Sequence, residues 1–199
     1  MKNMKIGFDL DDVLCDTYSI ILEESLRYHC EVLKRKAIKR NIFESKGDYF
    51  YFAKSLRWGD KETEDFFYDF YPEFLKRCIP YDGVVDILKK LINRGNEVHI
   101  ITARERRINE DVFRITEDWL IKWGISYNYL NLGEKDKSEY IKKNGIDIFV
   151  DDSWDNCKKV YKNTGCKVFH MICPYNKYGE YDYNKYEIIP ITQLSEMKF

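Results

Sequence analysis

The chain has 199 residues, enough for one good-sized core or for a core with a small appended domain. With 34% charged and 44% hydrophobic residues and a formal net charge of −1, it is globular in composition and has no general affinity for nucleic acid polymers or acidic membranes. Its six cysteines include no C-x-x-C pair, which argues against a zinc cage. We expect a soluble, cytoplasmic protein, because no segment resembles a signal peptide or a membrane span.

Five short segments are apolar over almost their whole length and are predicted to be strands. Continuous apolar runs, rather than alternating ones, are typical of a parallel sheet that is covered by helices on both faces. The segments are 5–10, 97–102, 126–132, 147–152 and 167–172.

Helical patterns follow the later strands. Residues 82–95 carry an apolar stripe, with Asp82 as the expected N-cap and Gly95 as the stop. Similar patterns that end at a glycine cover 109–124, 137–145 and 153–165. The alternation of strands and helices predicts an α/β fold with a Rossmann-like, doubly wound parallel sheet. The tyrosine-rich segment 175–190 is expected to wrap the surface.

A long interval without a convincing strand separates the first predicted strand from the helix at residue 82. A βα loop normally needs about 2–6 residues, so we predict that 17–77 form a small helical cap inserted into a core made of 1–16 and 78–199. The aromatic residues of this cap favour a small core of its own over a nucleobase-stacking surface. They include Phe43, Tyr49, Phe50, Tyr51, Phe52 and Trp58.

Polar residues gather where the predicted strands end, which is the edge where open α/β sheets bind ligands. Carboxylates from separate strands can hold Mg²⁺, and a carboxylate in line with phosphorus can act as a nucleophile. A second carboxylate can transfer protons, while a hydroxyl and a lysine can bind phosphoryl oxygens. Asp155 fits the first turn of a helix better than a metal site. The residues at this edge are Asp9 and Asp11; Thr102, Ala103 and Arg104; Lys135 and Lys137; and Asp151 and Asp152.

The segments "DLDDVLCDT", "ITAR", "KSEYIK" and "VDD" resemble, in this order, motifs one to four of the haloacid dehalogenase superfamily of phosphohydrolases. The resemblance implies that Asp9 is the nucleophile, that Asp11 is the general acid/base and that Thr102 binds phosphate. The third motif contributes Lys137 or Lys135; Lys137 is favoured because it opens a helix and because its distance to "VDD" matches other members.

The same resemblance implies a Mg²⁺ ion as cofactor. Its ligands would be the Asp9 carboxylate, the Asp11 backbone carbonyl and the Asp152 carboxylate, with Asp151 in support. Ala103 and Arg104 would join Thr102 and the lysine in binding the substrate; for Arg104, an exposed position away from the substrate is the equally favoured alternative. The insertion after the first motif is where the superfamily places a type-one helical cap.

Within the superfamily, the first two motifs and a following "TEDWL" most resemble the 5'(3')-deoxyribonucleotidase group and its bacterial relatives. This implies hydrolysis of a small phosphate ester, with nucleoside monophosphates favoured as substrates. A phosphatase of sugar phosphates is the alternative. C–halogen cleavage needs no acid at position 11 and is disfavoured, as is a receiver-type phosphoacceptor domain, which would carry its aspartate on a middle strand. The oligomeric state is open, with a homodimer among the options.

Overall fold

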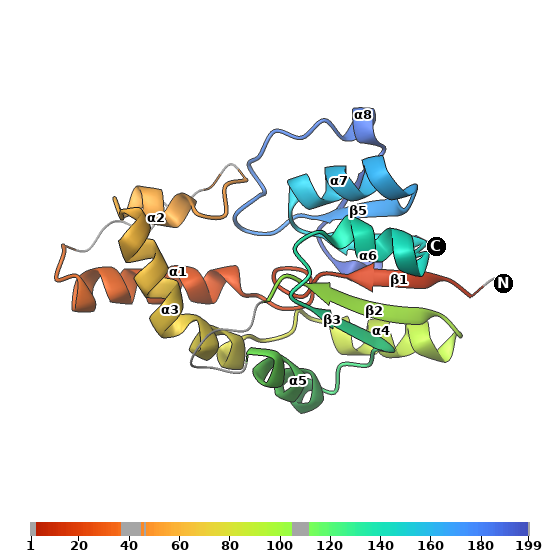
Figure 1. The fold of residues 1–199 in the computed structure, drawn as a ribbon, viewed down its shortest axis with the longest axis horizontal. Coiled ribbons are helices and arrows are strands. Elements are labelled where there is room, and N and C mark those ends of the chain that lie inside the picture. Colours follow the sequence, from red (N-terminus) through yellow and green to blue (C-terminus); the bar gives the residue numbers. More distant parts are fainter. Residues whose placement is uncertain (1–2, 37–44, 46, 105–111, 199) are drawn as a thin grey trace.

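The computed structural model describes residues 3–36, 45, 47–104 and 112–198. Within these residues, six parallel strands form one sheet in the order β3-β2-β1-β4-β5-β6 (Figure 1). This confirms the predicted α/β class and the parallel sheet. The strands are β1 Lys5–Phe8, β2 Glu97–Thr102, β3 Tyr129–Leu132, β4 Ile148–Asp151, β5 Lys167–Met171 and β6 Ile189–Ile191.

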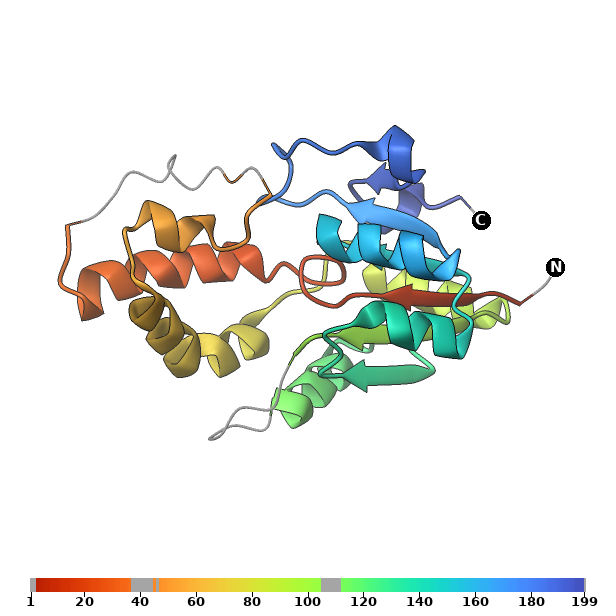
Figure 2. The same cartoon turned by 45° about the horizontal axis from the view of Figure 1, so that its top comes forward.

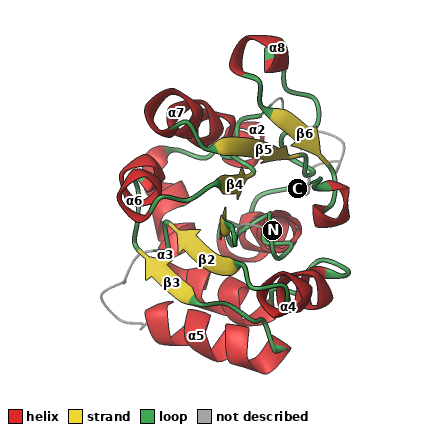
Figure 3. Cartoon of the chain, turned by 90° about the vertical axis from the view of Figure 1, so that its right-hand side faces the viewer, coloured by secondary structure: helices red, strands yellow, loops and turns green. Residues whose placement is uncertain are grey.

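Helices cover both faces of the sheet, as Figure 3 shows in a view along the strands. Neighbouring strand residues point to opposite faces: Ile100 packs in one apolar cluster with Leu88 and Trp119, and Ile101 packs in another with Ile141. A strand that is buried on both faces is apolar at most of its positions, which explains the nearly continuous apolar runs in the sequence. The covering helices are α4 Val84–Asn93 and α5 Val112–Trp123 on one face, and α6 Lys137–Asn144 and α7 Trp154–Thr164 on the other.

One local prediction is wrong and another is incomplete. The N-cap of α4 is Gly83, which has a left-handed φ of 79°, and no side chain caps this helix. The segment after residue 174 does more than wrap the surface, because it also forms the short helix α8 Tyr183–Tyr186 and the edge strand β6. Of the predicted helix 109–124, residues 109–111 lie outside the described part.

Among the described residues, four helical elements stand between β1 and α4 and pack on a core of their own (Figure 2). Phe66 is fully buried at the centre of this core, with its ring 5.1–6.0 Å from those of Tyr28, Phe52, Trp58, Phe67, Phe70 and Phe74. Phe52 and Trp58 therefore belong to this core as predicted, whereas Phe50 is 49% exposed. Phe43 lies outside the described residues. The elements are α1 Tyr18–Arg27, the π-helical turn η1 Tyr28–Val32, α2 Tyr51–Ser55 and α3 Asp60–Arg77.

The strands point their carboxyl ends toward this helical group, and both chain termini lie at the far end of the sheet (Figures 1 and 2). The strand ends and the helical group therefore face each other across the site described below. None of the helices in the described residues has the length and apolarity needed to span a membrane.

Candidate active site

Asp9 directly follows β1, and its position is fixed by the sheet. Its backbone N–H donates to the carbonyl of Val150 in the neighbouring strand β4, at 2.9 Å. The chain then turns sharply through Asp12, which has a left-handed φ of 57°, a conformation that aspartate tolerates better than most residues. The turn leaves the side chain of Asp9 only slightly exposed at the carboxyl edge of the sheet.

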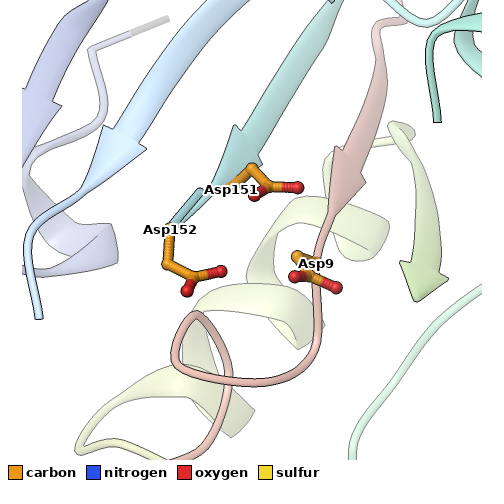
Figure 4. Close-up of side chains that lie close together, drawn as sticks. All are labelled: Asp9, Asp151 and Asp152. Carbon is orange, nitrogen blue, oxygen red and sulfur yellow. The ribbon is translucent and has the colours of Figure 1, made fainter. Parts of the chain in front are cut away.

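Three buried carboxylates converge at this edge, from the ends of the adjacent strands β1 and β4 (Figure 4). Asp9, Asp151 and Asp152 each offer an oxygen, and these oxygens lie within 4.8 Å of one another. The buried Lys137 ammonium, at the first residue of α6, is 2.8 Å from Asp9 Oδ2 and 2.7 Å from Asp151 Oδ2. One ammonium cannot balance three carboxylates, so this group fits a hard divalent cation with oxygen ligands.

The pKa values reflect this excess of negative charge. Burial raises the pKa of Asp9 to about 6, against the opposing effect of Lys137. The pKa of Asp152 lies well above its usual range because of burial and then because of the neighbouring Asp151. A nearby divalent cation would favour the charged forms and reverse both shifts.

The carboxylate of Asp11 lies outside this group of three and is held by two partners. Arg104 donates to both of its oxygens, at 2.9 and 2.7 Å, and the Thr17 hydroxyl donates to Oδ1 at 2.6 Å. Burial alone would raise the pKa of Asp11, but the Arg104 guanidinium, the Thr17 hydroxyl and Lys137 together outweigh burial and lower it. Asp11 is therefore held as a carboxylate at the side of the cluster.

The remaining predicted residues differ in their burial and contacts. Thr102 is the buried last residue of β2, and its hydroxyl accepts the backbone N–H of Arg104 at 3.3 Å. Ala103 is exposed at the cleft. Of the two candidate lysines, Lys137 is buried against Asp9, whereas Lys135 is exposed. Asp155 lies in the first turn of α7 and pairs with Lys158 at 2.7 Å, with its side chain 89% exposed.

A support for Asp152 comes from the loop after β5, which the sequence motifs do not mark. The Tyr175 hydroxyl donates to Asp152 Oδ2 at 2.6 Å, and the Asn176 side chain donates to the Asp152 carbonyl at 2.8 Å. Both residues are buried. The Tyr175 ring also contacts Tyr18 and Tyr49 of the helical group, at 5.3 and 5.1 Å between centroids. The tyrosine-rich composition of this segment was the only signal in the sequence.

A cleft of about 1230 Å³ opens above the carboxylates. That volume exceeds the roughly 300–1,000 Å³ that is usual for small-molecule sites and is sufficient for a substrate much larger than phosphate. The sheet edge contributes Asp9, Asp11, Thr102 and Lys137, and the helical group contributes aromatic side chains. These aromatic residues are Tyr49, Phe50, Trp58, Phe67 and Tyr71, and they face Trp154, Tyr175 and Tyr181 of the core.

Comparison with known proteins agrees with this arrangement. The model of the haloacid dehalogenase-like hydrolase family matches residues 6–117, more than half of the chain. The chain belongs to the haloacid dehalogenase-like hydrolase family and is a hydrolase of that class.

Two individual relatives with similar sequences are each 26% identical to this chain. A protein of Halalkalibacterium halodurans named "Putative nucleotidase BH1399" is 26% identical over 177 residues, which cover 88% of this chain and 83% of the relative. A "Putative nucleotidase" of Bacillus cereus is 26% identical over 160 residues, or 75% of this chain and 76% of the relative.

Solved structures share the fold at low sequence identity. A "predicted phosphatase" from Clostridium acetobutylicum superposes with a TM-score of 0.67 at 15% identity, covering 98% of this chain and 96% of the other. A "predicted phosphoglycolate phosphatase" from Haemophilus somnus superposes with a TM-score of 0.65 at 19% identity, covering 96% and 94%. At this identity the likeness concerns the fold alone.

Proposed function

We propose that the protein is a Mg²⁺-dependent phosphomonoesterase that hydrolyses nucleoside monophosphates through an aspartyl phosphate on Asp9. The observation that carries the proposal is the group of three buried carboxylates with one lysine, at the sheet edge of a chain that belongs to this hydrolase family. The names of the relatives, together with the size and aromatic lining of the cleft, favour a nucleotide.

In the proposed reaction, a carboxylate oxygen of Asp9 attacks phosphorus and the bond from phosphorus to the ester oxygen breaks. Asp11, a carboxylate in the free protein, takes up a proton from solvent when the substrate binds and passes it to the leaving oxygen. Water then attacks the phosphorus of the aspartyl phosphate and loses a proton to Asp11, so that inorganic phosphate leaves and Asp9 is restored. The Thr102 hydroxyl and the Lys137 ammonium bind phosphoryl oxygens.

Asp9, Asp151 and Asp152 would hold the cation, with the Asp11 backbone carbonyl as a further ligand. A bound Mg²⁺ would neutralise these carboxylates and stabilise the negative charge of the phosphoryl group. We also propose that residues 17–77 act as the cap that selects the substrate, above a core made of 1–16 and 78–199.

The test is phosphate release from a panel of nucleoside monophosphates, sugar phosphates and phosphoglycolate, in Mg²⁺ and in EDTA. We expect the nucleotides to have the highest kcat/KM and EDTA to abolish turnover. Asp9→Asn should lower kcat by at least about 10³-fold, because it removes the nucleophile. A higher kcat/KM for a sugar phosphate or phosphoglycolate would overturn the proposed substrate class. Full activity of Asp9→Asn would overturn the proposed mechanism.

A further inference from the structure

Arg104 is a buried cation that contributes to the lining of the cleft, and its guanidinium is bound by protein groups. The side chain has no exposed surface. Its Nε and Nη2 atoms form a fork on the two oxygens of Asp11, at 2.9 and 2.7 Å. Nη1 donates to the hydroxyl of Thr116 in α5 at 3.2 Å, and Nη2 also contacts Cys15 Sγ at 3.8 Å. Arg104 therefore links Asp11 to the helix layer beneath the sheet.

This geometry fixes the orientation of the Asp11 carboxylate. A two-point contact from a planar guanidinium sets both the position and the plane of a carboxylate, which the single ammonium of a lysine cannot do. The Thr17 hydroxyl, at 2.6 Å from Asp11 Oδ1, adds a third contact from the start of the helical insertion. The carboxylate is nevertheless 22% exposed, so it remains accessible from the cleft.

We propose that Arg104 is a positioning residue that holds Asp11 for proton transfer, and that it is not a ligand of the substrate phosphate. The inference rests on the proposed function, in which Asp11 protonates the leaving oxygen. Arg104 then acts on the reaction only through Asp11. Binding of phosphate by Arg104, which its place after Thr102 would suggest, is the competing role.

The two roles differ in their dependence on the leaving group. The oxygen that leaves a nucleoside monophosphate is a poor leaving group and needs a proton, whereas 4-nitrophenolate leaves as a stable anion. Loss of proton transfer therefore slows the first substrate much more than the second. Loss of a phosphate ligand slows both substrates alike, because their phosphoryl groups are the same.

The experiment measures kcat/KM of Arg104→Met for a nucleoside monophosphate and for 4-nitrophenyl phosphate, both in Mg²⁺. The value of kcat/KM depends on the steps from substrate binding to the departure of the leaving group. We expect a loss of about 10²-fold or more for the nucleotide and less than about 5-fold for the aryl phosphate. Arg104→Lys should restore only a small part of the nucleotide activity. Arg94→Met, the same change at an exposed arginine after α4, is the matched control and should alter neither value.

A second comparison adds Arg104→Met to the Asp11→Asn variant. This variant lacks the negative charge of Asp11, which Arg104→Met alone would leave without its partner. There, adding Arg104→Met should change the aryl phosphate kcat/KM by less than about 3-fold, because the residue through which Arg104 acts is already disabled. A further large loss in this background, or equal losses for both substrates in the single variant, would overturn the proposal in favour of a phosphate ligand. Failure of the proposed function is distinguished because the wild-type protein would then hydrolyse neither substrate.

Discussion

Asp9, Asp11, Asp12 and Asp16 follow a single strand closely, yet each carboxylate has a different partner. Asp12 Oδ1 accepts the backbone N–H of Tyr18 at 2.9 Å, and Asp16 Oδ1 accepts that of Ser19 at 3.1 Å. These two side chains cap the first turn of α1, where the N–H groups would otherwise be unpaired. Asp9 and Asp11 remain available to the cleft. The dense acidic segment thus combines two structural carboxylates with two proposed catalytic ones.

The charge imbalance at the carboxylate cluster predicts opposite effects of Asp152→Asn with and without metal. In EDTA the variant should be more stable than wild type by about 1 kcal/mol, because one of three mutually repelling buried carboxylates is removed. In Mg²⁺ it should be less stable than wild type, because the ion loses a ligand and the stabilisation by binding falls. Thermal unfolding at several Mg²⁺ concentrations measures both effects.

The control for this experiment is Asp118→Asn, which makes the same change at an exposed position of α5. It should leave the Mg²⁺-induced rise in Tm as in the wild type. An Asp152→Asn variant with an unchanged rise in Tm would show that the ion is held elsewhere.

The sequence predicts which residues form the candidate site but not all of their contacts. Lys137, the lysine favoured from the sequence, is the first residue of α6, and its ammonium is buried against Asp9. Lys135 precedes the helix and is exposed. The motif "ITAR" places Arg104 near the strand end. Whether its guanidinium meets phosphate or Asp11 depends on the path of a long side chain, which no sequence pattern specifies.

Within the helical insertion, the aromatic residues divide into two groups with different expected roles. Phe66→Ala should lower the free energy of unfolding by about 3–5 kcal/mol, because it empties the centre of a packed aromatic core. Phe50→Ala should cost less than about 1 kcal/mol, since Phe50 is 49% exposed and lines the cleft. It should instead raise KM for a nucleoside monophosphate more than for a sugar phosphate, because only the nucleotide offers a base to stack.

Urea unfolding and steady-state kinetics of the two variants check this division. If Phe50→Ala raises KM equally for both substrates, or for neither, its ring does not bind a base. If Phe66→Ala unfolds with wild-type stability, the aromatic cluster does not hold the helical group together.

Elements with strong patterns were predictable, and those set by backbone geometry were not. Strand β2 matches its predicted bounds because all of 98–102 is buried and three of these five residues are apolar. Strand β6 was missed because it has three residues, includes Pro190 and buries only Ile191, so it has no strand pattern of its own. At α4, the left-handed turn at Gly83 replaces the expected cap by Asp82.

At the scale of the whole molecule, one loop connects the proposed metal site with the helical insertion. Tyr175 bonds Asp152 and packs on Tyr18 and Tyr49, and its carbonyl accepts the N–H of Gly47 at 3.2 Å. The order of the motifs along the chain predicts which strand ends meet, because parallel strands share one carboxyl edge. It does not predict this contact or the shape of the cleft, since the insertion carries no motif and its packing follows from tertiary contacts.

Covalent attack by Asp9 on phosphorus is the central step of the proposed mechanism, and chemical trapping tests this step directly. The protein is mixed with a nucleoside monophosphate and Mg²⁺, quenched with acid during turnover and reduced with borohydride, which converts an aspartyl phosphate to homoserine. Mass spectrometry of the N-terminal peptide should find homoserine at residue 9 in a sample that received substrate, and aspartate in one that did not. Phosphate release with aspartate intact at residue 9, or with homoserine at another position, would contradict the account.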